Sequence, residues 1–208
     1  GKFTMKKVIG LIIAAILAIG VFAGTVFCVY TFGDFDKDGQ DSKKKTENEE
    51  VIENVGFIYM HANYAWGKQI NGYYVDVDGK KYKFDFSDYD GKMSTDLAIT
   101  HHDEKSSGKI NAGKMAKLAK RARRVGDDLE LVGYSYAMDM GAFSVYSVIY
   151  DEDGDYEISL LGEYGDWIFV PDDDNARYIS EYFGLDFSAV ENMTPVGHMG
   201  KDGVYKRY

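Results

Sequence analysis

The sequence predicts an α+β fold: a mainly antiparallel β-sheet that packs with two or three helices, preceded by a single transmembrane helix. Three observations support this prediction. Alternating apolar residues flank two Asp-Gly pairs, which is the pattern of tight β-hairpins. Two later stretches carry apolar residues at every third or fourth position, as amphipathic helices do. Close to the start, one uncharged run extends over 8–32.

The run 8–32 is long enough to cross a bilayer. A helix rises about 1.5 Å per residue, so this run exceeds the roughly 30 Å hydrocarbon core. Lys2, Lys6 and Lys7 precede it, and positive charge favours the cytoplasmic side. We therefore expect a cytoplasmic basic end at 1–7, a single-pass anchor in the cell membrane at 8–32, and an extracytoplasmic C-terminal part.

The same segment has a second interpretation, a cleaved secretion signal. Cleavage near Ala23 would release the rest of the chain, although the apolar run continues past that residue to Phe32. Met5-Lys6-Lys7 is typical of the start of a bacterial secretory segment. Both interpretations place the folded part at the cell surface or beyond it.

Gly20 and Gly24 form a small-xxx-small pattern within this run. Such spacing lets two membrane helices approach closely and would support a homodimer. Chance spacing in a segment rich in glycine and alanine is the simpler explanation.

The charge balance and the cysteine count limit the function classes. The formal net charge is −10, which argues against nucleic acid as the main partner because its phosphates would be repelled. The single cysteine, Cys28, lies inside the apolar run, so the rest of the chain has neither a disulfide nor thiol chemistry. With 17 tyrosines and 2 prolines, the composition suits a sheet-rich domain or a recognition surface.

Residues 33–50 are almost wholly polar and predict a charged, flexible tether, so that the folded domain spans 51–208. Within the tether, Asp34, Asp36 and Asp38 have the spacing that opens a calcium loop. The loop lacks its usual bidentate glutamate, so the pattern predicts weak Ca²⁺ binding at most. A solvated acidic tether is the alternative, and we expect no other cofactor.

The strands and hairpins of the domain follow from period-two patterns bounded by turn residues. Asp76, Asp78 and Gly79 recur later as Asp151, Asp153 and Gly154, so 72–91 resembles 147–166. This likeness predicts a duplicated hairpin-plus-helix unit, unless hairpins with Asp-Gly turns simply look alike. Further strands are expected at 55–60, 97–100, 129–136 and 167–170.

Helices are predicted where apolar residues share one arc at 100° per residue. The first covers 112–125, with Asn111 as its N-cap and Gly126 as its stop. The second follows the acidic residues 172–174, which stabilise the positive end of a helix dipole. A short third helix is expected at 187–193.

The first of these helices is strongly basic. Between Lys105 and Val125 there are eight positive charges and no negative one. This pattern predicts a binding surface for an anionic envelope polymer, lipid head groups or a protein partner. A solvated helix face that balances acidic strands is the alternative interpretation. The residues concerned are Lys114, Lys117, Lys120, Arg121 and Arg124.

Two further groups of side chains are candidates for recognition or chemistry. Tyr73 and Tyr89 belong to the first hairpin and are expected to be exposed for contact with a ligand. His101 and His102 are adjacent, so on a strand they would point to opposite faces and would not share one metal ion. We expect an exposed loop there.

Taken together, these features predict a membrane-anchored, extracytoplasmic binding or interaction domain without enzymatic activity. Two alternatives remain open. One is an envelope-associated hydrolase with carboxylates or the pair His101 and His102 in its site. The other is a sensor or inhibitor that grips a partner protein.

Overall fold

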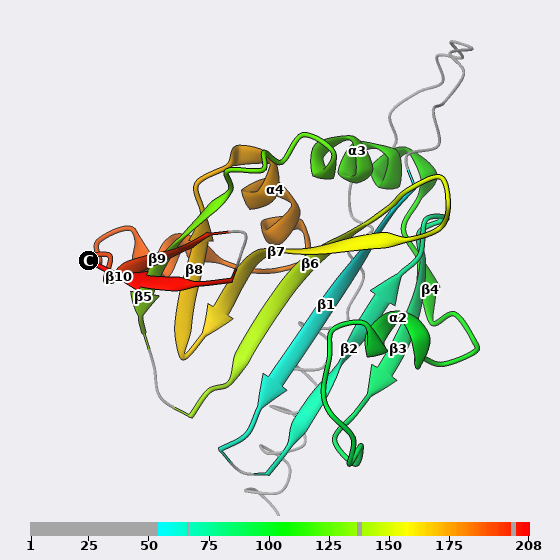
Figure 1. Cartoon of the computed structure of the whole chain (residues 1–208), viewed down its shortest axis with the longest axis horizontal. Helices are drawn as coiled ribbons and strands as arrows, with labels where there is room; N and C mark the ends of the chain where they lie inside the picture. Colours follow the sequence, from blue (N-terminus) through cyan, green and yellow to red (C-terminus); the bar gives the residue numbers. More distant parts are fainter. Residues whose placement is uncertain (1–53, 66, 137–138, 201–202) are drawn as a thin grey trace, which may run out of the picture. The chain divides into compact units, whose positions relative to one another are not determined.

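An antiparallel sheet dominates the computed structural model, which describes residues 54–65, 67–136, 139–200 and 203–208 (Figure 1). These residues all belong to the unit Glu50–Tyr208. The strands run in the order β10-β9-β5-β8-β7-β6-β1-β2-β3-β4, and neighbouring strands are antiparallel throughout. The strands are β1 (Val55–Asn63), β2 (Gln69–Val75), β3 (Lys80–Asp85), β4 (Gly108–Lys109), β5 (Glu130–Ser135), β6 (Ala142–Tyr150), β7 (Tyr156–Gly165), β8 (Trp167–Pro171), β9 (Gly197–Gly200) and β10 (Tyr205–Arg207).

Several expectations fall outside the described residues. They concern the basic end 1–7, the anchor 8–32 with its glycine pair and cleavage position, and the tether with its aspartates. They stay predictions.

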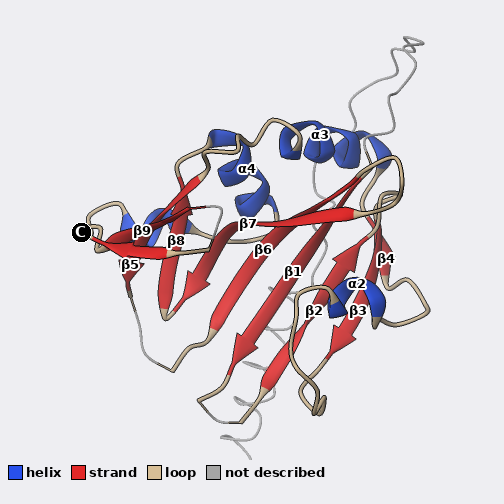
Figure 2. Cartoon of the chain, viewed as in Figure 1, coloured by secondary structure: helices blue, strands red, loops and turns tan. Residues whose placement is uncertain are grey.

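The helices lie on both faces of the sheet (Figure 2). Helices α3 (Ala112–Ala122) and α4 (Asp174–Tyr182), with the 3₁₀ turn η1 (Phe187–Val190), cover one face, and α2 (Leu97–Thr100) lies on the other. The Asn111 side chain caps α3 by accepting from the Lys114 N–H at 2.8 Å. Asp173 caps α4 by accepting from two backbone N–H groups, at 2.7 and 2.9 Å. The predicted α+β class with a mainly antiparallel sheet is thus confirmed.

Each face of the sheet has its own core. Residues of β1 alternate between the two, because successive side chains on a strand point to opposite faces. Val55 and Phe57 join the core under α3 and α4, whereas Ile58 joins the core under α2. All three side chains are fully buried.

The strand predicted at 97–100 is wrong, because these residues form α2. The His101 N–H donates to the Leu97 carbonyl at 2.8 Å, which closes a helical turn. Ala98 is 1% exposed and packs with Phe84 and Phe86. Four residues are too few to separate helical from strand periodicity, and packing on the sheet decides the outcome.

Two helix ends also differ from their predictions. Helix α3 ends at Ala122, because the Val125 N–H donates to the Ala122 carbonyl in a tighter turn that stops the α-helix. The helix predicted at 187–193 is the shorter 3₁₀ turn η1, which buries Phe187 and Val190.

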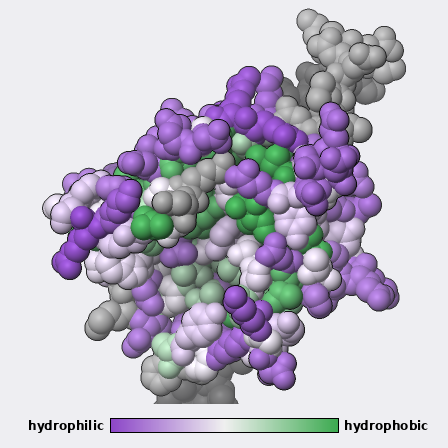
Figure 3. Space-filling view, viewed as in Figure 1, coloured by the Kyte–Doolittle hydropathy of each residue, from purple (hydrophilic) through white to green (hydrophobic). Residues whose placement is uncertain are grey.

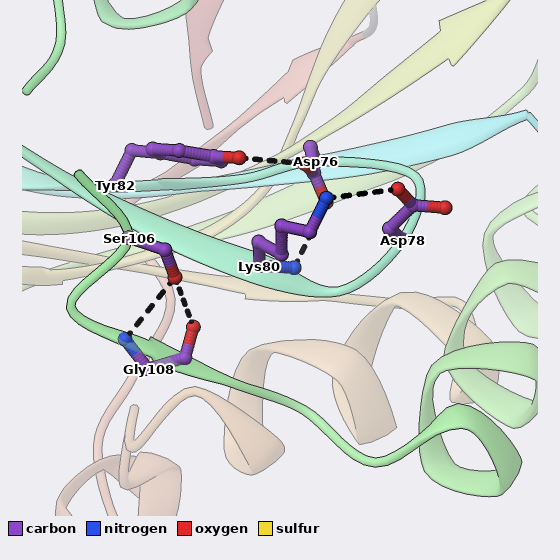
Figure 4. Close-up of polar contacts among 6 residues, drawn as sticks. All are labelled: Asp76, Asp78, Lys80, Tyr82, Ser106 and Gly108. Carbon is purple, nitrogen blue, oxygen red and sulfur yellow. Dashed lines mark hydrogen bonds and ion pairs between the residues drawn. The ribbon is translucent and has the colours of Figure 1, made fainter. Parts of the chain in front are cut away.

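The two Asp-Gly turns share a side-chain hydrogen bond. Asp76 accepts from the Lys80 N–H at 2.8 Å through its side chain, and Asp151 accepts likewise from the Asp155 N–H at 2.9 Å. Gly79 has φ +80° and Gly154 φ +88°, conformations that glycine adopts readily. Figure 4 shows Lys80 also pairing with Asp78 in the first turn, and Ser106 bonding to Gly108 nearby. The duplication of a whole unit stays a prediction.

A substitution at Gly72 tests the close pairing of β1 and β2. A Cβ added there would overlap the Tyr59 carbonyl oxygen and lie 3.0 Å from the Met60 Cα, both in the neighbouring backbone. Gly72→Ala should therefore lower the free energy of unfolding by about 1–3 kcal/mol or more. Gly108→Ala is the control, because the nearest atom is a lysine carbon at 3.9 Å. Equal urea midpoints for the two variants would contradict this pairing.

Buried tyrosines make the fold sensitive to alkali. Burial raises the pKa of both Tyr59 and Tyr146 to about 12, from an ordinary value of 10.0. Between these pH values the folded chain binds more protons than the unfolded chain, so stability falls as the pH rises. Each tyrosine contributes at most about 1.4 kcal/mol per pH unit. Urea unfolding across this range should show the fall, and Tyr59→Phe should make it shallower.

Candidate anion-binding surface

Packing of α3 on the sheet turns its basic residues outward. The apolar side of the helix buries Met115, Leu118, Ala119 and Ala122, so the lysines and arginines occupy the remaining arc. Figure 3 shows hydrophilic residues along the edge of the molecule where α3 and α4 lie in Figure 1. Helix α4 packs beside α3, which brings its own side chains next to the basic ones.

Three cations of α3 converge on one tyrosine of α4. The Lys117 ammonium lies 4.8 Å from the centre of the Tyr178 ring, and the Arg121 guanidinium lies 4.1 Å from it. The Lys114 ammonium lies 5.8 Å from the same ring and 4.9 Å from the Tyr182 ring. These distances are typical of cation–π contacts, which hold cationic heads in place. We call these five residues the cation–tyrosine surface.

The three cations have no carboxylate partner among the described residues. Ion pairs in the described part of the chain include Lys80 with Asp78 and Arg177 with Glu181, and neither involves these three cations. Glu181, which lies on α4, is thus already paired within its own helix at 2.9 Å. Arg121 donates to the neutral Asn175 side chain at 3.1 Å. No carboxylate in the described part of the chain therefore forms a close ion pair with these three cations.

The nearby positive charge changes the pKa of the Tyr178 phenol. A hydrogen bond with Lys117, with smaller contributions from Lys114, lowers the pKa of Tyr178 below its usual value of 10.0, and partial burial opposes the change. The negative form of the phenol is therefore favoured at this position. The same cations would favour an external anion placed beside them.

The structure separates the basic residues that the sequence predicts together. Lys114, Lys117 and Arg121 join the cation–tyrosine surface. Lys120 and Arg124 are exposed and take part in none of its ring contacts.

The sequence prediction did not include the tyrosines of α4. Neither Tyr178 nor Tyr182 is named among the binding residues that the sequence predicts. Their spacing of four positions puts both on one side of a helix, which is the signal that was available. What the spacing alone could not show is that α3 lies alongside.

The predicted exposure of the hairpin aromatics holds for only one of them. Tyr89 is 36% exposed, and the Lys68 ammonium lies 5.4 Å from its ring. Tyr73 is not exposed, which corrects the prediction. Its ring stacks on that of Tyr59 at 5.2 Å, because residue 73 points to the face that α4 covers.

The histidines have separate surroundings. His102 lies against the rings of Tyr82 and Tyr74, at 4.6 and 5.4 Å between centroids. His61 stacks on Phe143 at 4.4 Å, and His198 lies 5.3 Å from Tyr208. In the described part of the chain, no three His, Cys, Asp or Glu side chains form a group that could hold a metal ion.

The comparisons with known proteins add no relative. No family model, curated protein or solved structure matches the chain. Within the ranges that the structure describes, no helix is both long and apolar enough to span a bilayer.

Titration of Tyr178 measures the positive charge directly. The difference in tyrosinate absorbance between the wild-type chain and Tyr178→Phe should show a pKa below 10.0. Lys117→Ser should raise it, because the largest stabilising contact of the phenolate is lost. Lys120→Ser, on the same helix, should leave it unchanged. A wild-type pKa at or above 10.0 would show that the cations do not act on this phenol.

Proposed function

We propose that the chain is a membrane-anchored, extracytoplasmic binding protein that holds an anionic ligand without catalysing a reaction. The observation that carries this proposal is the convergence of Lys114, Lys117 and Arg121 on Tyr178 with no carboxylate partner in the described residues. Cations placed this way are ready to accept an anion from outside.

The residue types suit phosphate or carboxylate groups. The planar guanidinium of Arg121 can donate two parallel hydrogen bonds to such an anion, and the lysines add mobile point charges. A hydrogen bond that involves a charged group contributes about 1.5–3 kcal/mol. Two or three such contacts are enough for a specific but reversible complex.

Burial supports binding at this surface over a purely solvated helix face. Lys114 and Arg121 are only partly exposed, and the rings of Tyr178 and Tyr182 restrict the freedom of the cations that lie over them. Side chains that are already ordered lose less entropy when a ligand binds. A helix face that served only solubility would not need this order.

Paired substitutions on α3 test the proposal. The full-length chain in neutral detergent should be retained on phosphocellulose at low salt, although its net charge is −10. Lys117→Ser with Arg121→Ser should weaken binding by about 10- to 100-fold, since two charge-assisted contacts are lost. Lys120→Ser with Arg124→Ser removes the same charge outside the surface and should change retention little.

Two further measurements make the result decisive. Thermal unfolding of each variant shows whether a loss of retention comes from weaker packing of α3 on α4. Lys117→Arg with Arg121→Lys keeps both charges and should restore retention. Failure of the wild-type chain to bind, or equal losses in the two Ser pairs, would refute the proposed site.

A further inference from the structure

We infer that the anionic ligand is an extended phosphate-bearing polymer that lies along a line of cations from α3, past α4, to β3. This inference rests on the proposed function and names its ligand class. It depends on a second cationic position and on the aromatic rings that join it to the cation–tyrosine surface.

The second position is Lys81 on β3. Its ammonium lies 5.6 Å from the centre of the Tyr73 ring, a cation–π contact like those on α3. Tyr73 and Lys81 come from neighbouring strands, since β2 pairs with β3. Lys81 is partly exposed.

Aromatic rings connect the two positions without a break. The Tyr73 ring lies 6.2 Å from that of Phe183, and Phe183 lies 5.3 Å from Tyr182. Tyr182 in turn lies under the Lys114 ammonium. Rings have few rotamers and pack rigidly. They therefore link Lys81 to Lys114 and to the cations around Tyr178 through successive ring contacts.

This spacing favours a chain over a single anion. One phosphate group can reach the cations around Tyr178 or Lys81, but several rings separate these positions. A polymer that carries a charge on each repeat can engage both. Once its first group is bound, the next binds at a high effective concentration, so affinity rises without any new kind of contact.

The surroundings argue against a lipid surface as the ligand. A helix that binds in the membrane interface exposes Trp, Phe or Leu beside its basic residues. The apolar residues of α3 are instead buried in the core, among them Met115 and Leu118. The large hydrophobic residues found exposed in the described ranges include none from α3 or α4. The surface offers charge without the apolar residues that a bilayer requires.

Chain length and one lysine test the inference. Binding of the full-length chain in neutral detergent would be measured for orthophosphate, short linear polyphosphate and long linear polyphosphate. Affinity per phosphate should rise at least about tenfold from orthophosphate to the long polymer. Lys81→Ser should weaken long-chain binding about fivefold and leave orthophosphate binding unchanged. Lys92→Ser removes one exposed charge from the loop before α2 and serves as the matched control.

The outcomes separate this inference from the proposed function. Equal effects of Lys81→Ser and Lys92→Ser, or equal affinity per phosphate at all lengths, would overturn the inference and leave a single-anion site. Tighter binding of polyglutamate, or of vesicles with anionic lipid, would overturn it in favour of a protein or a membrane. Failure of every anionic probe, polyglutamate included, would remove the proposed function as well. Lys81→Arg should restore long-chain binding and excludes a folding defect of β3.

Discussion

The rest of the structure depends on the burial of β1 on both of its faces. This strand pairs with β2 on one side and β6 on the other, so it joins the two hairpins into one sheet. Phe57 is buried under the helices and Ile58 under the opposite layer. Fully burying a side chain of this size contributes about 1.5–3 kcal/mol. Two cores are therefore anchored to a single strand.

The same packing determines the candidate site. Leu118 is fully buried in the core, which fixes the rotation of α3 about its axis. The charged residues must then face away from the sheet, because an unpaired charge is costly to bury. Helix α4 is held alongside and supplies Tyr178, so the position of the cation–tyrosine surface follows from the position of the core.

The sequence predicted those features that depend on local periodicity. The hairpin turns, the main strands and both amphipathic helices follow from spacing and turn residues, and the cap of α3 follows from Asn111. Helix α2 was missed because four residues carry no clear period. The sequence could not show that Lys117 and Arg121 contact the Tyr178 ring whereas Lys120 and Arg124 do not. All four lie on the outer arc of α3, and only the packing of α4 against that arc separates them.

The acidic background of the chain makes the placement of a few cations more important than their number. An anion is repelled by most of a chain whose net charge is −10. At physiological ionic strength charges are screened beyond about 8 Å, so the basic helix attracts a ligand only at short range. Binding therefore depends on cations held at the right distance from one another. The rings of Tyr178, Tyr182 and Tyr73 lie against those cations and restrict them, so the proposed recognition depends on the tyrosines as well as on the charges.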